Sequence, residues 1–256
     1  MKCSIITVTF NAEKFLEKTM LSILNQSCKD FEYIIVDGAS KDKTVEIITS
    51  YELRITNSEF QGVRPEQFRW ISEPDKGLYD AMNKGIELAT GDFVWFINAG
   101  DLIYDEHTLQ NIMNAYSKAP ESDTVYGQSL MIDEHENALG ERHKIAPKHL
   151  TKNDLLKGLV VGHQSILVRK TIAPKYDLQY TICADYDWTI KVLKKSESNG
   201  YIDQYLSKFL ISGLSSQKRK TGWVERYSIM KKHFGLCKTL WAHLLITLKY
   251  PFSRKY

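Results

Sequence analysis

The chain has 256 residues, of which 43% are hydrophobic and 25% are charged, so it can bury a core as one large domain and is not intrinsically disordered. Its four cysteines (Cys3, Cys28, Cys183 and Cys237) form no C-x-x-C pair, which argues against a zinc ribbon or a disulfide framework. The net charge of +3 conceals an asymmetry, because residues 218–256 carry +9 and the preceding 217 residues carry −6.

Neither a targeting segment nor a membrane-spanning segment is expected from the ends of the sequence. Met1-Lys2 leads directly into a strand-like run, so no signal peptide is expected. The longest uncharged stretch near the C-terminus, residues 239–248, is about half the length needed to cross a bilayer. We therefore expect a cytoplasmic protein.

Strands and helices are predicted to alternate through the first hundred residues. Short apolar runs predict strands over Cys3–Thr9, Phe31–Val36, Phe68–Ile71 and Phe93–Ile97. Helical spacing of apolar residues predicts one helix that follows Asn11 as its cap, a second over Thr44–Tyr51 and a third from Leu78 to Ala89. A polar loop is expected at residues 57–67, between the second helix and the third. This alternation predicts a parallel, doubly wound sheet, which binds ligands beyond the carboxyl ends of its strands.

The second half of the chain has a looser pattern. Helices are predicted over Thr108–Tyr116 and Asp185–Lys195, and strands over Thr124–Ile132 and Ser165–Val168. No internal repeat or low-complexity segment interrupts them.

The first strand-to-helix turn, residues 9–13, contains no glycine. A dinucleotide-binding turn and a P-loop both need glycines there, so those two nucleotide-binding solutions are disfavoured. A glycine-rich opening loop is also typical of sugar nucleotidyltransferases. Asp37 and Asp101 instead place carboxylates at the expected ligand-binding edge, where Mg²⁺ or Mn²⁺ would have to lie between them and a nucleotide diphosphate.

Four ordered segments carry a family resemblance: "IITVTFNAEKFLEKTMLSIL", "YIIVDGASKDKT", "SEPDKGLYDAMNKGIELATGD" and "FINAGD". They resemble the successive motifs of the family 2 glycosyltransferases, in particular the bacterial branch that builds exopolysaccharide, capsule and O-antigen, of the colanic-acid glycosyltransferase type. The resemblance implies an α/β, GT-A-like (Rossmann-like) fold with a mostly parallel central sheet flanked by helices and a helical C-terminal tail. It also implies a nucleotide-sugar donor, an inverting reaction and a divalent metal, Mg²⁺ or Mn²⁺.

The resemblance also suggests a division of the chain. Residues 1–215 would form the glycosyltransferase domain, with a nucleotide-sugar-binding half at 1–101 and an acceptor-side half at 102–215. Residues 216–256 would form a basic, amphipathic, helical C-terminal segment.

The family motifs assign a set of residues to the nucleotide. These are Thr9, Asn11, Asp37, Asp75, Lys76 and Asn83. Three of them have simpler explanations: Asp37 fits an Asx turn, Asn11 fits a helix cap, and Lys76 fits a solvated loop lysine.

Asp101 corresponds to the family's metal ligand. Related sequences often carry two acids here, whereas this chain reads Asn98-Ala99-Gly100-Asp101. The missing acid predicts either weaker metal binding or a different contact to the donor, for which Asn98 is the candidate. A capping role for Asp101 is the alternative.

Two later motifs supply the remaining candidates. In "TICADYDWTIKVL", Asp185 matches the family's general base, although Ala184 replaces the acid that often precedes it, and Asp187 is the fallback. A helix cap is the alternative for Asp185. In "VVGHQSILVRK", His163 is expected to face the donor sugar, diphosphate or metal, against a purely structural role.

Cations and apolar residues interleave along residues 218–256, as in a helix that lies on an anionic membrane. A lipid-linked saccharide acceptor would suit such a peripheral enzyme on the inner face of the plasma membrane. Packing of this segment on the catalytic domain is the alternative. Nucleic acid is not expected as a partner, because the body of the protein is acidic and carries no RNA- or DNA-binding motif.

The sequence thus predicts a glycosyltransferase that moves a sugar from a nucleotide donor to a hydroxyl in bacterial surface polysaccharide biosynthesis. Two other functions stay open. One is a non-catalytic sugar-nucleotide-binding or scaffold protein on the same fold. The other is a sugar nucleotidyltransferase, which would release pyrophosphate.

Overall fold

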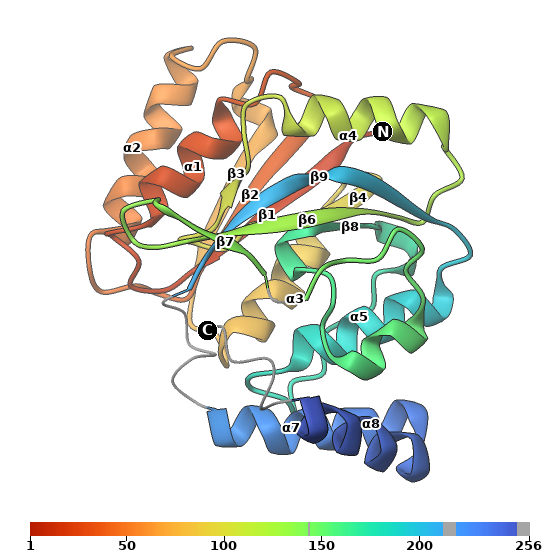
Figure 1. The fold of residues 1–256 in the computed structure, drawn as a ribbon. Coiled ribbons are helices and arrows are strands. Elements are labelled where there is room, and N and C mark those ends of the chain that lie inside the picture. Colours follow the sequence, from red (N-terminus) through yellow and green to blue (C-terminus); the bar gives the residue numbers. More distant parts are fainter. Residues whose placement is uncertain (143, 212–218, 250–256) are drawn as a thin grey trace.

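The computed structural model describes residues 1–142, 144–211 and 219–249. They form a mixed β-sheet with helices on both faces (Figure 1). The strand order is β3-β2-β1-β4-β8-β6-β9-β5, and β7 pairs with β6 outside this path.

The N-terminal half of the sheet is parallel, as the alternating pattern predicts. It consists of β1 (Cys3–Thr9), β2 (Phe31–Asp37), β3 (Phe68–Ser72) and β4 (Phe93–Phe96). Every residue of β1, β2 and β4 is buried, because helices cover both faces of this part of the sheet. The carboxyl ends of β1 and β2 are in register, with Thr9 opposite Asp37.

The C-terminal half of the sheet is mixed. It consists of β5 (Leu102–Ile103), β6 (Thr124–Ile132), β7 (Ala138–Glu141), β8 (Ile166–Arg169) and β9 (Asn199–Leu210). Strand β8 is antiparallel to both β4 and β6, whereas β6 and β9 are parallel. The sheet is therefore continuous across both halves of the chain, and its mostly parallel GT-A-like character is confirmed.

Five helices sandwich the sheet (Figure 1). Helices α1 (Leu16–Leu24), α2 (Thr44–Thr56) and α4 (Thr108–Lys118) cover one face, and α3 (Leu78–Leu88) and α5 (Ala184–Lys195) cover the other. Short 3-10 turns lie at Pro65–Gln67, Lys152–Lys157, His163–Ser165 and Lys170–Ile172. Alternate strand residues such as Ile5 and Ile6 belong to two separate hydrophobic clusters, one on each face.

The predicted cap of α1 is wrong. The helix begins at Leu16, and the residue before it, Phe15, makes no side-chain capping bond. Asn11 adopts a left-handed backbone (φ 48°), and its Oδ1 accepts a hydrogen bond from the backbone N–H of Lys41 at 2.8 Å. The side chain is therefore used to hold the neighbouring loop after β2.

Two further helices follow, α7 (Arg219–Phe234) and α8 (Leu236–Lys249), and they pack against each other below α5 (Figure 1). Ile229 and Met230 are completely buried, so α7 packs closely on the rest of the protein. No helix in the described ranges is long and apolar enough to cross a membrane. The parts of the predicted 216–256 segment at 216–218 and 250–256 lie outside the described residues.

Candidate functional site

A pocket of about 400 Å³ opens beyond the carboxyl end of β4. Its walls come from α3, the turn after β4, the 3-10 turn at His163, the start of α5 and the end of β9. Four residues singled out in the sequence line it together: Asn98, Asp101, His163 and Asp185. The fold thus brings side chains from three distant motifs to one cavity.

Asp101 lies in the wall of this pocket and is only 5% exposed. Its Oδ2 accepts a hydrogen bond from Gln164 Nε2 at 2.8 Å, and its Oδ1 accepts one from the backbone N–H of Leu210 at 3.1 Å. Burial raises the pKa of Asp101 to about 7, although these two hydrogen bonds oppose the shift. Asp101 does not cap a helix, because the residues after it form the short strand β5.

The backbone at Gly100 favours glycine over any residue with a side chain. Gly100 has φ +103°, a conformation that side chains disfavour. A Cβ built at this position would also lie 2.9 Å from Leu210 Cδ2. A side chain at position 100 is therefore disfavoured in this turn, which holds Asp101 against the end of β9.

Asn98 contributes an unsatisfied polar atom to the same pocket. Its side-chain Oδ1 is buried and has no hydrogen-bond partner among the described residues. Its backbone carbonyl accepts the N–H of Asp101 at 2.8 Å. A buried carbonyl oxygen without a partner is costly, so this atom is available to a ligand.

Asp185 lies in the first turn of α5, between the pocket and a second cavity. Its Oδ1 accepts hydrogen bonds from Tyr79 Oη at 3.3 Å and from the backbone N–H of Tyr186 at 2.8 Å. Burial raises the pKa of Asp185 to about 6. The cap position of α5 is Cys183, so the capping alternative does not explain Asp185.

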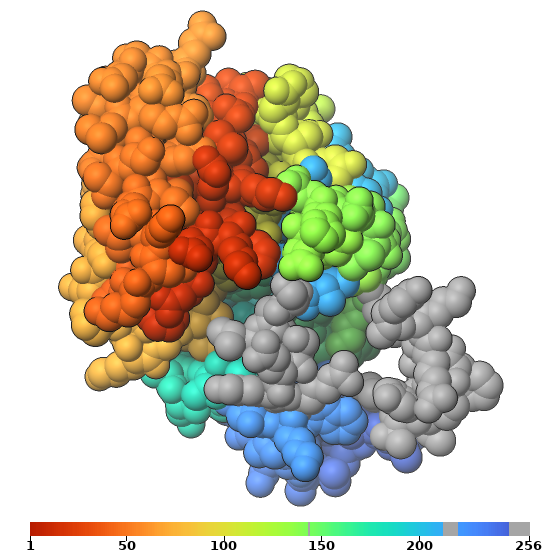
Figure 2. Space-filling view, turned by 90° about the vertical axis from the view of Figure 1, so that its left-hand side faces the viewer, coloured from red at the N-terminus to blue at the C-terminus, as the bar shows by residue number. Residues whose placement is uncertain are grey.

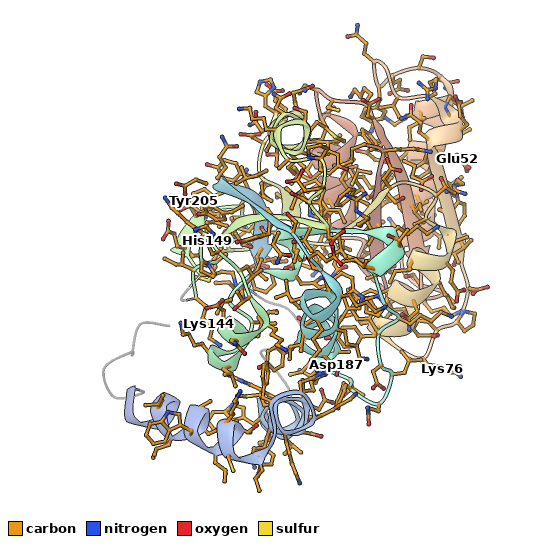
Figure 3. The ribbon with its side chains drawn as sticks, turned by 90° about the vertical axis from the view of Figure 1, so that its right-hand side faces the viewer. Glu52, Lys76, Lys144, His149, Asp187 and Tyr205 are labelled. Carbon is orange, nitrogen blue, oxygen red and sulfur yellow. The ribbon has the colours of Figure 1, made fainter. Side chains whose placement is uncertain are left out.

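Asp187, the fallback base, does not line the pocket. Its carboxylate is completely buried and lies 2.5 Å from Lys191 Nζ and 2.7 Å from His233 Nε2. Burial alone would raise its pKa, but His233 and Lys191 outweigh that effect and hold the pKa of Asp187 at about 2. Asp187 thus anchors α7 to α5 (Figure 3).

His163 forms part of the pocket wall and is 5% exposed. Its Nε2 lies 2.5 Å from Tyr176 Oη, and its ring packs against Phe96 and Trp188. Burial lowers the pKa of His163 to about 4, so the imidazole is neutral at physiological pH.

Four of the proposed nucleotide-binding residues form a separate cluster where β1 and β2 end. Asp37 is completely buried and accepts hydrogen bonds from Ser40 and Ser72. Asn11 donates its backbone N–H to Ser40 Oγ, and the Thr9 carbonyl accepts the N–H of Gly38. Asp75 joins them, because a Cβ built on Gly38 would lie 2.5 Å from Asp75 Oδ2.

Two features of this cluster bear on ligand binding. The hydroxyl of Thr9 is buried and has no hydrogen-bond partner among the described residues. The carboxylate of Asp75 accepts the N–H of Gly77 at 2.7 Å, which leaves Oδ2 directed toward Gly38. The cluster does not line the 400 Å³ pocket.

The other two proposed nucleotide residues lie apart from both groups. Lys76 is exposed at the edge of the molecule (Figure 3). Asn83 is buried, and both ends of its amide bind the backbone of Tyr176, at 3.1 Å through Nδ2 and 2.7 Å through Oδ1. In this structure Asn83 therefore fixes the loop that carries Tyr176.

Glu225, on α7, supports the loop before α5 and was not predicted from the sequence. Its carboxylate accepts the backbone N–H groups of Thr181 (2.8 Å), Ile182 (2.9 Å) and Cys183 (2.9 Å), directly before Asp185. One feature of the sequence could have indicated Glu225: it is the single acidic residue in a segment, 218–256, that also contains ten Lys or Arg residues.

Other unpredicted residues complete the site. Gln164 follows His163 in a motif that did attract attention, and Tyr79 belongs to the predicted helix 78–89. Arg142 and Leu159 reach the pocket from the irregular region after β7, where the sequence shows no periodic pattern.

Comparisons with known proteins identify the family. The model for "Glycosyl transferase family 2" matches residues 4–176. A PGL/p-HBAD biosynthesis glycosyltransferase of Mycobacterium bovis is 32% identical over 192 residues, which cover 73% of this chain and 68% of the relative. This relative is named for PGL/p-HBAD biosynthesis, whereas the motifs had suggested the colanic-acid type.

Solved structures confirm the fold. S. aureus TarS 1–349 in complex with UDP-GlcNAc superposes with a TM-score of 0.72 at 17% identity, over 100% of this chain and 76% of that one. Against the UDP complex of the same fragment, this chain spans 64% of that chain's length. The Pyrobaculum calidifontis mannosyltransferase PcManGT, in complex with GDP-Man and Mn²⁺, gives a TM-score of 0.69 at 14% identity, over 98% of this chain and 71% of that one.

The ordered motifs, the GT-A-like fold and a family match over more than half of the chain agree. The protein is therefore a member of glycosyl transferase family 2.

Proposed function

We propose that the protein transfers a sugar, with inversion, from a nucleotide-sugar donor to an acceptor hydroxyl. The observation that carries this proposal is the pocket itself, in which Asp101 and Asp185 line one cavity in different surroundings. Asp101 is held by Gln164 and Leu210, and Asp185 lies at the start of α5 beside Tyr79. Because the two carboxyl groups have different partners at different parts of the pocket wall, one can serve the donor and the other the acceptor.

Asp185 is the proposed general base. Its pKa of about 6 leaves the carboxylate largely deprotonated at neutral pH while keeping it basic enough to accept a proton. In the reaction, the acceptor oxygen forms a bond to the anomeric carbon and transfers its proton to Asp185. The bond from the anomeric carbon to the diphosphate breaks, and attack opposite the leaving group inverts the anomeric centre.

Asp101 and Asn98 are the proposed ligands of a divalent cation, Mg²⁺ or Mn²⁺. Both offer hard oxygen atoms, and the buried Oδ1 of Asn98 lacks any other partner among the described residues. Among the described residues, no group of three or more His, Cys, Asp or Glu side chains is arranged to hold a metal ion, so the donor phosphates would complete the coordination. When bound, the cation would neutralise charge on the leaving diphosphate.

The cluster at the ends of β1 and β2 is the proposed nucleotide site. Its support is the unpartnered hydroxyl of Thr9 and the free edge of Asp75, with Asn11 and Asp37 shaping the loop around Ser40. The similar TarS and PcManGT structures contain UDP-GlcNAc and GDP-Man, respectively. We extend the nucleotide assignment to Lys76 and Asn83 on the family motifs alone.

Neutral His163 is proposed to line the donor-sugar subsite. Its Nε2 is engaged by Tyr176, and its ring packs on Phe96 and Trp188, which are buried behind it. His163 itself lines the pocket, so its ring is the surface that the donor sugar would meet. His163 would therefore shape the subsite without carrying charge.

The acceptor is proposed to be a saccharide or lipid-linked saccharide of the bacterial cell surface. The support is the name of the M. bovis relative, a glycosyltransferase of PGL/p-HBAD biosynthesis. Residues 102–215 would form the acceptor-side half of a domain that spans 1–215, and 216–256 would be an appended segment on the cytoplasmic side of the membrane.

Release of nucleoside diphosphate across a panel of nucleotide sugars with Mn²⁺ tests the proposal. A glycosyltransferase releases the diphosphate, and the release accelerates with a suitable acceptor. Pyrophosphate release would instead establish a nucleotidyltransferase. Donor binding without release in the presence of cell-surface glycolipid extracts would favour a non-catalytic sugar-nucleotide-binding protein.

A further inference from the structure

A second cavity of about 430 Å³ lies on the other side of Asp185. Residues from the end of β6, the segment after β7, the loop before α5 and the start of α7 line it. They are Met131, Arg142, Lys144, Leu159, Ile182, Cys183, Asp185, Tyr186, Gly222, Trp223 and Arg226. Asp185 and Arg142 also line the first pocket, so the two cavities are neighbours.

Three of these side chains are cations, and none of them makes an ion pair with any described residue. Arg142 and Arg226 each donate one hydrogen bond, to the backbone carbonyls of Leu159 (3.3 Å) and Lys157 (3.2 Å), respectively. Arg142 Nη1 and Arg226 Nε are buried and have no partner within the described ranges. Buried guanidinium donors that are left open are costly unless a ligand satisfies them.

Gly158 shows how closely these cations converge. A Cβ built on it would clash with Lys144 Nζ and would lie 2.8 Å from Arg226 Nη2. The two cationic groups therefore flank the same point, beside a residue whose φ of +100° favours glycine. Figure 3 shows Lys144 on the side of the protein body that faces α7 and α8.

The cations destabilise one another without an anion between them. Burial, and then the charges of Arg226 and Arg142, lower the pKa of Lys144 to about 8. Among the described residues, Asp185 is the only acid that lines the cavity, and its carboxylate accepts hydrogen bonds from Tyr79 and Tyr186. A phosphate group would supply both the missing negative charge and several acceptor oxygens.

We propose that this cavity binds a phosphate group of the acceptor. Asp101, at the proposed donor end, lines only the first pocket, whereas Lys144 and Arg226 line only the second cavity, and Arg142 and Asp185 line both. An acceptor held there by its phosphate would present a hydroxyl to Asp185. Trp223, which is 73% exposed at this cavity, offers an apolar contact for the group attached to the phosphate.

That the phosphate belongs to the acceptor rests on the proposed function, whereas the binding of a phosphate group does not. The test therefore starts with binding of phenyl phosphate, measured by isothermal titration calorimetry on the full chain. We expect Lys144→Gln and Arg226→Gln to weaken binding at least about tenfold, the effect of losing one charge-assisted hydrogen bond. Lys148→Gln, which removes an exposed lysine paired with Asp203, is the matched control and should bind as the wild type does.

A second arm separates the acceptor's phosphate from the donor's diphosphate. Phenyl phosphate should still bind in the presence of saturating UDP or GDP with Mn²⁺, and both variants should keep the wild-type affinity for those nucleotides. Displacement by either nucleotide, or loss of nucleotide affinity in the variants, would assign the cations to the donor and overturn the proposal. Absence of phenyl phosphate binding, or equal weakening in Lys148→Gln, would overturn it too.

The two variants differ in how far they are expected to affect the stability of the fold. Arg226 donates a hydrogen bond that helps to hold α7, whereas Lys144 makes none within the described residues. Lys144→Gln removes a charge that the other two cations repel, so it should not lower the melting temperature, and its binding defect is the decisive one. If no nucleotide binds to the wild type, the proposed function fails while phenyl phosphate binding still decides this inference.

Discussion

At the residue scale, Asp101 and Asp185 differ in what holds them and not only in position. Asp101 is clamped by a side-chain amide and a backbone N–H, and Asp185 by a phenol and the N–H of its neighbour in α5. Burial raises the pKa of both, to about 7 and about 6, respectively. Two carboxyl groups in one cavity with distinct partners can take separate roles in one reaction.

The pH dependence of turnover tests the role of Asp185. Only the deprotonated carboxylate can accept the hydroxyl proton, and its raised pKa is about 6. The rate at saturating metal should therefore be constant above neutral pH and fall about tenfold per pH unit well below 6. Steady-state kinetics from pH 4.5 to 8.5 would show this limb, and a rate that rises as the pH falls below 6 would contradict the assignment.

Replacement of Asp101 by Asn tests the metal site. The variant keeps the shape of the side chain but removes the negative charge that a divalent cation needs. We expect Mn²⁺-dependent binding of nucleoside diphosphate to weaken at least about tenfold, and EDTA to reduce wild-type affinity similarly. Titration calorimetry with and without Mn²⁺ measures both effects, and equal affinity in wild type and variant would remove Asp101 from the metal site.

At the element scale, a side chain of α7 holds the loop that precedes α5. Glu225 accepts three consecutive backbone N–H groups at residues 181–183, and Asp185 follows two residues later. Helix α7 is also tied to α5 through His233 and Asp187. A basic C-terminal helix is therefore part of the support for the proposed base.

Glu225→Gln should lower the turnover number and leave nucleotide affinity unchanged. The glutamine amide lacks the negative charge that strengthens the three hydrogen bonds. Its loss should reduce the free energy that keeps the loop at residues 181–183 ordered by about 1–3 kcal/mol. Turnover and nucleotide binding measured well below the melting temperature separate this positioning effect from general destabilisation.

Glu121→Gln, an exposed acid remote from the pocket, is the control for Glu225→Gln. It should leave turnover unchanged. Unchanged turnover in Glu225→Gln as well would show that α7 does not position Asp185.

The parallel half of the sheet could be predicted because its strands are buried on both faces and separated by clear helices. Strand β9 could not, because exposed residues interrupt its apolar ones and its register against β6 shifts twice. The expected cap at Asn11 failed for a similar reason, since its side chain binds a residue 30 positions away. Patterns along the chain do not reveal such long-range pairings.

The candidate site was only partly visible in the sequence for the same physical reason. Asn98, Asp101, His163 and Asp185 follow recognisable motifs, and they line one pocket. Arg142 and Glu225 lie in segments without motifs and reach the site only through the tertiary fold. The ion pair between Asp187 and His233 of α7 likewise could not be predicted from the sequence.

At the scale of the whole molecule, the C-terminal helices form one end of the protein, opposite the N-terminal layers (Figure 2). Several large apolar side chains of α7 and α8 are exposed there, including Trp223, Trp241 and Leu240. Exposed Lys residues on the same helices, such as Lys231 and Lys238, accompany them. Helix α7 therefore packs on the protein through Ile229 and Met230, which are buried, while other apolar side chains of the helix, such as Trp223, remain exposed.

This surface predicts binding to anionic vesicles. Apolar side chains inserted among headgroups and lysines near the surface both favour association, by about 1 kcal/mol per cation at low salt. Flotation with phosphatidylglycerol-containing liposomes should recover the wild type, and Trp223→Ser combined with Trp241→Ser should float much less. Equal recovery with neutral phosphatidylcholine, or no recovery at all, would remove the membrane proposal.

The proposed sugar transfer depends most directly on Asp185 as its general base. The decisive measurement compares wild type with Asp185→Asn for two quantities, nucleoside diphosphate release with acceptor and Mn²⁺, and donor binding by calorimetry. We predict that the variant loses about 10²–10⁴-fold in rate and keeps the donor affinity. Wild-type turnover in Asp185→Asn would contradict the central claim.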